Sequence, residues 1–173
     1  MNVYGSRRIY HGRVIDLRVD EVDARKGGRR DFEVAEHKGG VVVIAQPEPS
    51  SIVLVRQYRH AVGEALWEVP AGILEPGEDP AVAAARELRE ETGYRAASMR
   101  FILSGYSSPG FCTELLRFFV AEELVAGEPS PDDDEEFDVQ TFAVNEAWAM
   151  VERGELRDLK SQLALAYAVM QMR

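Results

Sequence analysis

Three glutamates lie within five residues of one another, at a spacing that a helix would bring to one side. They belong to the run Arg86-Glu87-Leu88-Arg89-Glu90-Glu91, whose residues are good helix formers. On a helix, Glu87 and Glu91 lie one above the other and Glu90 lies beside them. Such like charges repel by roughly 0.2–0.5 kcal/mol per pair. A divalent cation would reverse this sign, because Mg²⁺ is held by carboxylates together with substrate phosphates. The spacing predicts a metal site for a phosphate ester, and the competing interpretation is an acidic helix face in water.

The residues around these glutamates carry the signals of a loop and of a complete helix. Four residues that interrupt regular structure predict a loop over residues 70–78: Pro70, Gly72, Pro76 and Gly77. Asp79 is expected to cap the helix that follows, Pro80 suits its first position, and Gly93 is expected to end it. The glutamates would therefore stand on a short helix behind a glycine-containing loop.

The full pattern is more specific than an acidic run, and its seven fixed positions are Gly72, Glu78, Arg86, Glu87, Glu90, Glu91 and Gly93. Together they resemble the box of the Nudix hydrolases, over residues 72–94. The pattern departs from the family only at Tyr94, where an aliphatic residue is usual and where we expect an adjustment of packing. The resemblance implies an enzyme that uses water to hydrolyse a diphosphate linkage.

The same resemblance implies how the metal is held. Two or three Mg²⁺ ions, with Mn²⁺ as a possible substitute, would be bound chiefly by Glu87, Glu91 and the carbonyl of Ala71. Glu90 would serve as a further ligand or as the general base. Arg86 would hold the carboxylates in position and offset part of their repulsion.

A Ser108-Pro109-Gly110-Phe111 segment follows the box. By itself, Pro-Gly predicts a turn between strands. A proline at this distance from the box, with a glutamate such as Glu114 after it, also resembles the ADP-ribose pyrophosphatases. That likeness implies that Pro109, Gly110 and Glu114 contact the substrate, and that ADP-ribose gives AMP and ribose 5-phosphate. The nearest alternative is a pyrophosphatase for another nucleotide sugar such as GDP-mannose, because those enzymes share similar loops.

An acidic segment, Asp132-Asp133-Asp134-Glu135-Glu136, offers another catalytic carboxylate. Blocks of like charge usually form solvated loops. In the ADP-ribose pyrophosphatases, however, the loop before the last strand of the sheet supplies a glutamate, which Glu135 matches best and Asp133 next. Such a carboxylate reaches the attacking water only when substrate is bound. The general base therefore stays open between Glu90, Glu135 and Asp133.

Arg59 and Glu68 flank the approach to the box. An arginine at the end of a strand is usually a surface residue. An acidic protein that binds a diphosphate nevertheless needs a local cation, and arginine suits bidentate phosphate contacts. The family pattern places an arginine against the substrate phosphates at Arg59. It also makes Glu68 a contact of the adenosine ribose or a neighbour of the site.

Composition limits the class of protein. The chain has 173 residues, 46% hydrophobic and 29% charged, which fits one compact domain with or without an extension. Its net charge of −10 argues against nucleic acid or an anionic membrane as partner. There is no apolar run long enough to span a membrane. Cys112 is the only cysteine, so no internal disulfide is possible, which fits a cytoplasmic location.

The hydrophobic patterns predict an α/β (α+β) fold. Residues 13–25 and 31–37 alternate charged and apolar positions around Lys26-Gly27-Gly28-Arg29 and predict a hairpin. Residues 41–44 and 52–55 are apolar runs and predict two buried strands of a central sheet.

Further strands and two helices are expected in the second half of the chain. The strands are predicted at residues 98–105, 114–121 and 138–144. One helix is predicted at 146–153, capped by Asn145 and stopped by Gly154, and another at about 159–171. The resemblance implies a Nudix-type α/β/α sandwich with a mixed central sheet.

Residues 1–39 are expected to form a β-strand extension ahead of a Nudix domain at 40–173. In similar enzymes such a segment swaps strands with a second subunit, and an isolated two-stranded ribbon is marginal in water. We therefore predict a homodimer, with Phe32, Tyr10 and Arg30 as candidates for contacting the base. A non-catalytic Nudix module that binds a nucleotide sugar is the distant alternative. A broken set of carboxylates would mark such a module, and this chain keeps them all.

Overall fold

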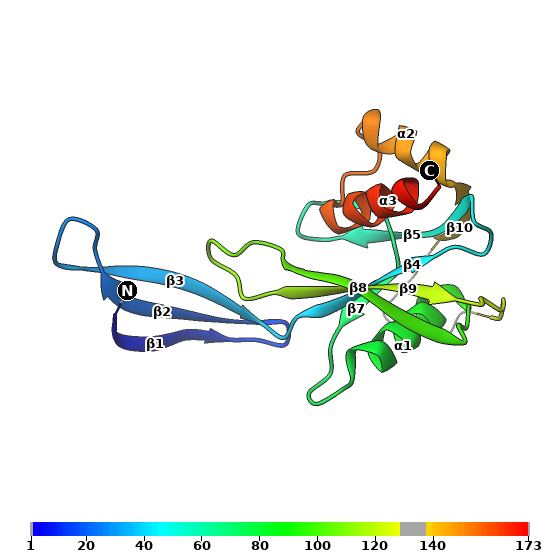
Figure 1. The fold of residues 1–173 in the computed structure, drawn as a ribbon. Helices are drawn as coiled ribbons and strands as arrows, with labels where there is room; N and C mark the ends of the chain where they lie inside the picture. Colours follow the sequence, from blue (N-terminus) through cyan, green and yellow to red (C-terminus); the bar gives the residue numbers. More distant parts are fainter. Residues whose placement is uncertain (1, 129–137, 173) are drawn as a thin grey trace. The chain divides into compact units, whose positions relative to one another are not determined.

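The computed structural model describes residues 2–128 and 138–172 (Figure 1). The chain divides into two compact units, of which one comprises Met1–Gly40 with Ser104–Leu116 and the other Val41–Leu103 with Arg117–Arg173. Within the described ranges, no helix is long and apolar enough to cross a membrane.

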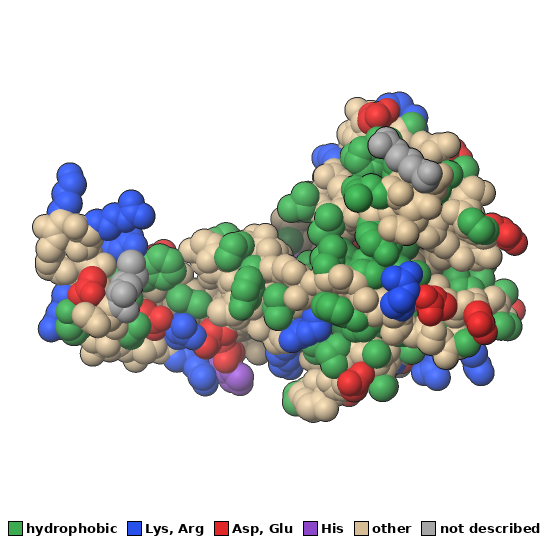
Figure 2. Space-filling model, viewed as in Figure 1, with side chains coloured by type: hydrophobic (Ala, Val, Ile, Leu, Met, Phe, Trp, Pro, Cys, Tyr) green, Lys and Arg blue, Asp and Glu red, His purple; other side chains and the backbone are tan. Residues whose placement is uncertain are grey.

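The first unit is built on a three-stranded antiparallel sheet in the order β1-β2-β3, comprising β1 (Val3–His11), β2 (Ile15–Asp23) and β3 (Arg29–His37). The predicted hairpin is confirmed as β2 and β3. Gly27 and Gly28 reverse the chain between them with φ angles of 86° and 83°, which favour glycine. β1 was not predicted, because its residues are exposed along its whole length and have no buried face to set a period. Figure 2 shows acidic and basic side chains next to one another over this unit.

Residues 104–116 lie beside β3 within the same unit. The amide of Ala35 donates to the carbonyl of Phe111 at 2.7 Å, and the amide of Thr113 donates to the carbonyl of Ala35 at 3.0 Å. The hydroxyl of Thr113 also accepts from the amide of His37 at 2.9 Å. These bonds fix the loop that contains the Pro-Gly turn against the sheet.

The strands of the second unit form two sheets, in the orders β10-β5-β6 and β7-β4-β9-β8. Their bounds are β4 (Gly40–Ala45), β5 (Ser51–Arg59), β6 (Glu64–Glu68), β7 (Ala71–Ile73), β8 (Ser98–Tyr106), β9 (Leu115–Glu122) and β10 (Asp138–Ala143). The five predicted strands in this part of the chain are present as β4, β5, β8, β9 and β10. Residues 41–44 and 52–55 were expected in one central sheet. This detail is wrong, because β4 and β5 belong to different sheets. Burial on both faces predicts a strand but does not select its partner.

One strand lies where a loop was predicted. β7 occupies part of residues 70–78, and the amide of Val43 in β4 donates to the carbonyl of Pro70 at 2.8 Å, directly before β7. Pairing with β4 therefore overrides the local signals of Pro70 and Gly72. The segment that enters the box is consequently held by a sheet.

In the described part of the chain, helices cover the two sheets on both sides: α1 (Pro80–Thr92) on one side, and α2 (Val144–Glu152) and α3 (Leu159–Gln171) on the other (Figure 1). The α/β/α arrangement is thereby confirmed. Three residues of α1, Ala83, Ala84 and Leu88, are fully buried and pack on apolar residues of β4, β5 and β9.

The ends of the helices follow the predictions with one exception. Asp79 caps α1 by accepting from the amides of Ala81 and Val82 at 2.8 and 3.3 Å, and Gly93 ends it with φ of 77°. The predicted cap of α2 is wrong, because that helix begins at Val144 and takes in Asn145. The amide of Val144 donates to the carbonyl of Ser50, so a tertiary contact satisfies the helix start in place of a side chain.

Candidate active site

Arg86 joins the carboxylates of the box. Its Nε and Nη2 atoms each donate to Glu78 at 3.0 Å, and its Nη1 donates to Glu87 at 2.7 Å and to Glu90 at 3.1 Å. Nη2 also donates to the carbonyl of Ile73 at 3.3 Å. The hydrogen bond to Glu78 is the main cause of the raised pKa of Arg86. Arg86 therefore contacts two carboxylates of the helix, and its role in holding them for a metal stays a prediction.

Glu78 serves as a support for Arg86. Its carboxylate receives both donors of the Arg86 fork and also accepts from the amide of Glu75 at 3.1 Å. The hydrogen bond from Arg86 lowers the pKa of Glu78 below its usual value of 4.5. Both oxygens of Glu78 therefore accept hydrogen bonds from protein donors.

The carboxylate of Glu87 lies directly against Gly72. A Cβ atom built at position 72 would overlap the carboxyl group of Glu87, so any side chain there would displace it. The close approach explains why glycine occurs at this position. It brings the Glu87 carboxylate against the backbone of β7, next to Ala71.

Glu91 connects α1 to the same segment. It is 5% exposed, and its Oε2 accepts from the amide of Ala71 at 3.2 Å. A buried carboxylate is rare unless it is paired or binds a cation. The structure therefore brings Ala71, Glu87 and Glu91 together, and their role as metal ligands stays a prediction.

These residues fit a divalent cation with oxygen ligands. Carboxylates and a backbone carbonyl are the donors that Mg²⁺ and Mn²⁺ prefer, and the absence of a side chain at Gly72 leaves one carboxylate lying against the backbone. As the described side chains stand, no three of the acidic, His or Cys residues surround one point. Arg86 donates to one oxygen of Glu87 and to one oxygen of Glu90, and each carboxylate has further lone pairs that can accept a cation.

Arg59 and Glu68 face one another from the neighbouring strands β5 and β6. Nε and Nη2 of Arg59 donate to the two oxygens of Glu68 at 2.7 and 2.6 Å. Burial alone would raise the pKa of Glu68, but the hydrogen bonds and charges of Arg59 and Lys160 outweigh it and lower the pKa. Glu68 is 2% exposed with both oxygens engaged, which favours a place next to the site over a ribose contact.

Pro109, Gly110 and Glu114 come together in one loop of the first unit. The carbonyl of Ser108 accepts from the amides of Phe111 and Cys112 at 3.1 and 2.9 Å, so the predicted turn is present. The Glu114 carboxylate lies 3.6 Å from Nδ1 of His37. A role for these residues in substrate binding stays a prediction.

The two loop candidates for the general base, Glu135 and Asp133, lie outside the described residues. Glu90 is described, and its side chain is 26% exposed beside Arg86. The choice among the three stays a prediction.

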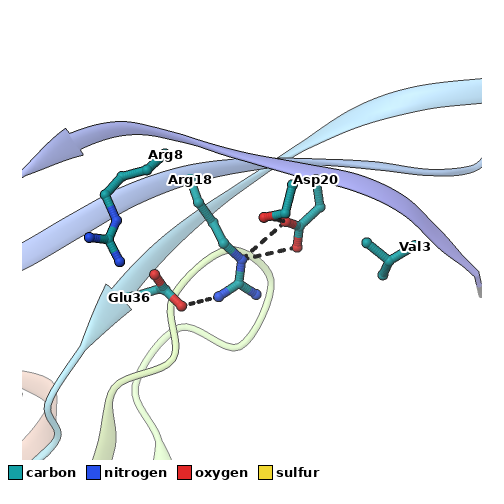
Figure 3. Close-up of a pocket in the computed structure, with 6 residues that line it drawn as sticks. Val3, Arg8, Arg18, Asp20 and Glu36 are labelled. Carbon is teal, nitrogen blue, oxygen red and sulfur yellow. Dashed lines mark hydrogen bonds and ion pairs between the residues drawn. The ribbon is translucent and has the colours of Figure 1, made fainter.

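Figure 3 shows a pocket of about 680 Å³ on the sheet of the first unit, lined by Val3, Ser6, Arg8, Arg18, Asp20 and Glu36. Arg18 pairs with Asp20 at 3.1 Å and with Glu36, and Ser6 donates to Asp20 at 2.6 Å. The hydrogen bonds from Ser6 and Arg18 lower the pKa of Asp20. This pocket contains none of the residues predicted for the site.

A known protein family matches most of this chain. The model of the NUDIX domain matches residues 36–163, which include the whole of the box. The chain belongs to the NUDIX domain family. The prediction of a Nudix hydrolase from the seven box positions is thereby confirmed, and divalent metal ions are the usual cofactors of this family.

Three relatives with different names resemble this Nudix protein over most of its length. An ADP-ribose pyrophosphatase of Bacillus subtilis (strain 168) is 39% identical over 162 residues, covering 92% of this chain and 88% of the relative. A methanol dehydrogenase activator of Bacillus methanolicus is 38% identical over 168 residues, covering 96% and 91%. A GDP-mannose pyrophosphatase of Shigella flexneri is 34% identical over 159 residues, covering 82% and 83%.

A solved structure confirms the fold of this Nudix protein. The crystal structure of an ADP compounds hydrolase superposes with a TM-score of 0.84, covering 99% of this chain and 92% of the other. At 19% sequence identity the likeness concerns the fold alone.

Among the residues that the structure describes, Lys160 is a charged partner of Glu68 that the sequence did not indicate. It comes from α3, 92 residues after Glu68, and its Nζ contacts the Glu68 carboxylate. No periodicity or spacing relates residues so far apart. Only the predicted helix at about 159–171 placed Lys160 in a helical first turn.

Proposed function

We propose that this protein hydrolyses the diphosphate linkage of ADP-ribose and releases AMP and ribose 5-phosphate. The observation that carries the proposal is the complete set of carboxylates on α1, held against the segment 71–73 by Gly72 and Ala71. The likeness to ADP-ribose pyrophosphatase over 92% of the chain supports the choice of substrate.

In this proposal Glu87, Glu91 and the Ala71 carbonyl hold two or three Mg²⁺ ions, with Mn²⁺ as a possible substitute. Bound Mg²⁺ would neutralise charge on the phosphates and lower the pKa of a coordinated water. Arg86 keeps Glu87 and Glu90 in place by hydrogen bonds from one nitrogen. Glu90 acts as a further ligand or takes the proton of the attacking water, unless Glu135 or Asp133 has that role.

Arg59 is proposed to contact the substrate phosphates. A guanidinium carries five N–H donors, and only two of those of Arg59 are bound by Glu68. The side chain is 40% exposed, and the proposal assigns its remaining donors to the substrate phosphates. Glu68 would fix the plane of this guanidinium. Pro109, Gly110 and Glu114, which belong to the first unit, are also proposed to contact the substrate.

GDP-mannose, or another nucleotide sugar, is the second candidate substrate, supported by the likeness to a GDP-mannose pyrophosphatase. The two candidates share the box chemistry and differ in the contacts to the base and the sugar. The distant alternative, a non-catalytic binding module, has no support from the intact carboxylate set.

A panel of nucleotide diphosphate compounds assayed with Mg²⁺, with products identified, tests this function. ADP-ribose should have the highest kcat/KM, EDTA should abolish turnover, and Glu91→Gln should lose about 100-fold or more. The exposed residue Glu146 on α2 provides the control, because Glu146→Gln removes the same charge elsewhere. Faster turnover of GDP-mannose would reject the substrate, and activity that persists in EDTA would reject the metal mechanism.

We also propose a homodimer formed through the extension at residues 1–39, and a cytoplasmic location. The strand β1 is exposed along its length and presents apolar side chains to solvent: Val3, Tyr4, Ile9 and Tyr10. An exposed edge of this kind is a template for pairing with another chain. Light scattering at micromolar concentration should give about twice the 19.3 kDa of one chain, and a monomeric mass would reject the dimer.

A further inference from the structure

The backbone of residues 69–71 is held by two side chains and by one backbone amide. The amide of Val69 donates to Oγ of Ser161 at 2.8 Å, and the amide of Ala71 donates to Glu91 at 3.2 Å. Between them, Pro70 has no amide hydrogen, and its carbonyl accepts from Val43 at 2.8 Å. Both amide donors of residues 69–71 are therefore bound by side chains of helices.

Ser161 connects Val69 to the start of α3. It is fully buried, and its hydroxyl donates to Oδ2 of Asp158 at 2.5 Å while it accepts from Val69. Asp158 also accepts from the amide of Ser161 at 2.9 Å and thereby caps α3. Because Asp158 takes the hydroxyl hydrogen, the lone pairs of Ser161 are directed to Val69.

Lys160 makes a second connection from the same helix turn. Its side chain is 16% exposed, and its Nζ lies between the carboxylates of Glu68 and Asp158, 3.0 Å from the latter. Glu68 in turn holds the guanidinium of Arg59. One turn of α3 therefore fixes both the backbone next to Ala71 and the partner of Arg59.

We propose that Lys160 and Ser161 are positioning residues of the active site, acting through Glu68 and Val69 to fix the Ala71 carbonyl and the Arg59 guanidinium. The inference rests on the proposed function, because it takes the Ala71 carbonyl as a metal ligand. Partners that orient a metal ligand without touching the metal commonly change affinity by about 10-fold or more when they are removed.

Two variants and a matched control test this inference without substrate. Ser161→Ala removes the acceptor of Val69, and Lys160→Gln removes the cation from Glu68. Arg157→Gln is the control, because Arg157 makes an ion pair with Glu64, which lies in β6 as Glu68 does. Lys160→Arg keeps the charge and should restore the behaviour of the original chain.

Two measurements are made on each variant. Amide hydrogen exchange by NMR should become about 5-fold or more faster at Val69 and Ala71 in Ser161→Ala and Lys160→Gln, and should not change there in Arg157→Gln. Mn²⁺ binding, followed by calorimetry, should weaken about 10-fold in the same two variants.

The outcomes separate this inference from the proposed function. The inference would be overturned if Ser161→Ala and Lys160→Gln had the same amide exchange and Mn²⁺ affinity as the control. It would also be overturned by faster exchange with unchanged Mn²⁺ affinity, because that result would leave these residues only a role in stability. If Ser161→Ala fails to fold, the comparison of Lys160→Gln with Lys160→Arg decides. A protein that passes both measurements but does not cleave ADP-ribose would reject the substrate and support the positioning role.

Discussion

The Cα atom of Gly72 lies so close to the carboxylate of Glu87 that no side chain fits between them. We therefore expect Gly72→Ala to push the carboxylate out of place at little cost in stability, since the end of a glutamate side chain can move. Displacement of a catalytic group by about 1 Å can cost roughly 100-fold in rate. Steady-state kinetics should show this loss in kcat, with a nearly unchanged melting temperature. Gly105→Ala is the control, because its Cβ would meet open space. Full activity of Gly72→Ala would contradict the role assigned to Glu87.

Replacement of Arg86 by lysine should destabilise the fold. Lysine cannot reproduce the fork that Arg86 presents to Glu78, and it would leave partly buried carboxylates poorly paired. We expect a loss of about 2 kcal/mol in the free energy of unfolding, measured with urea.

Arg153 offers a matched control for this change. It donates to both oxygens of Glu155, but both side chains are about half exposed. Arg153→Lys should therefore alter the free energy of unfolding by less than about 0.5 kcal/mol. Equal losses of unfolding free energy in Arg86→Lys and Arg153→Lys would show that the partly buried carboxylates around Arg86 do not increase its contribution to stability.

Stability should decrease in acid partly through Glu78. Its pKa in the folded protein is lowered by Arg86, so the unfolded chain binds more protons between the two pKa values. The contribution of Glu78 is present above its usual pKa of 4.5 and is lost as the pH falls through the lower folded value. Urea unfolding between pH 6 and 3 should therefore show a smaller dependence on pH in Glu78→Gln than in the original chain. Parallel curves would exclude Glu78 as a source of acid sensitivity.

The cap of α1 should have a measurable effect on stability. Asp79→Ala removes the acceptor of two amides at the helix start and should cost about 1 kcal/mol. Asp79→Asn keeps an acceptor oxygen and should retain most of this contribution. Thermal unfolding followed by circular dichroism provides the measurement. An Asp79→Ala variant as stable as Asp79→Asn would show that the cap is not needed.

The parts of the site with local signals could be predicted from the sequence. Asp79, Pro80 and Gly93 define α1 by their own conformational preferences, and helical geometry then places Glu87, Glu90 and Glu91 on one side. No distant residue is needed for either inference.

The remaining features depend on contacts between distant segments. β7 forms because Ala71–Ile73 meets the edge of β4, which the signals within residues 70–78 do not report. The pairing of Arg59 with Glu68 depends on how β5 lies beside β6. The contribution of Lys160 depends on where α3 packs. The spacing of residues in the sequence does not predict these contacts between distant segments.

The helix α1 presents the glutamates on one side and buries Ala83, Ala84 and Leu88 in the core on another. The chemistry and the packing are therefore carried by the same thirteen residues. Opening of α1 would expose Leu88 together with the glutamates, and core helices generally open only at free energies close to that of global unfolding. Heat inactivation of this enzyme should therefore coincide with its cooperative unfolding.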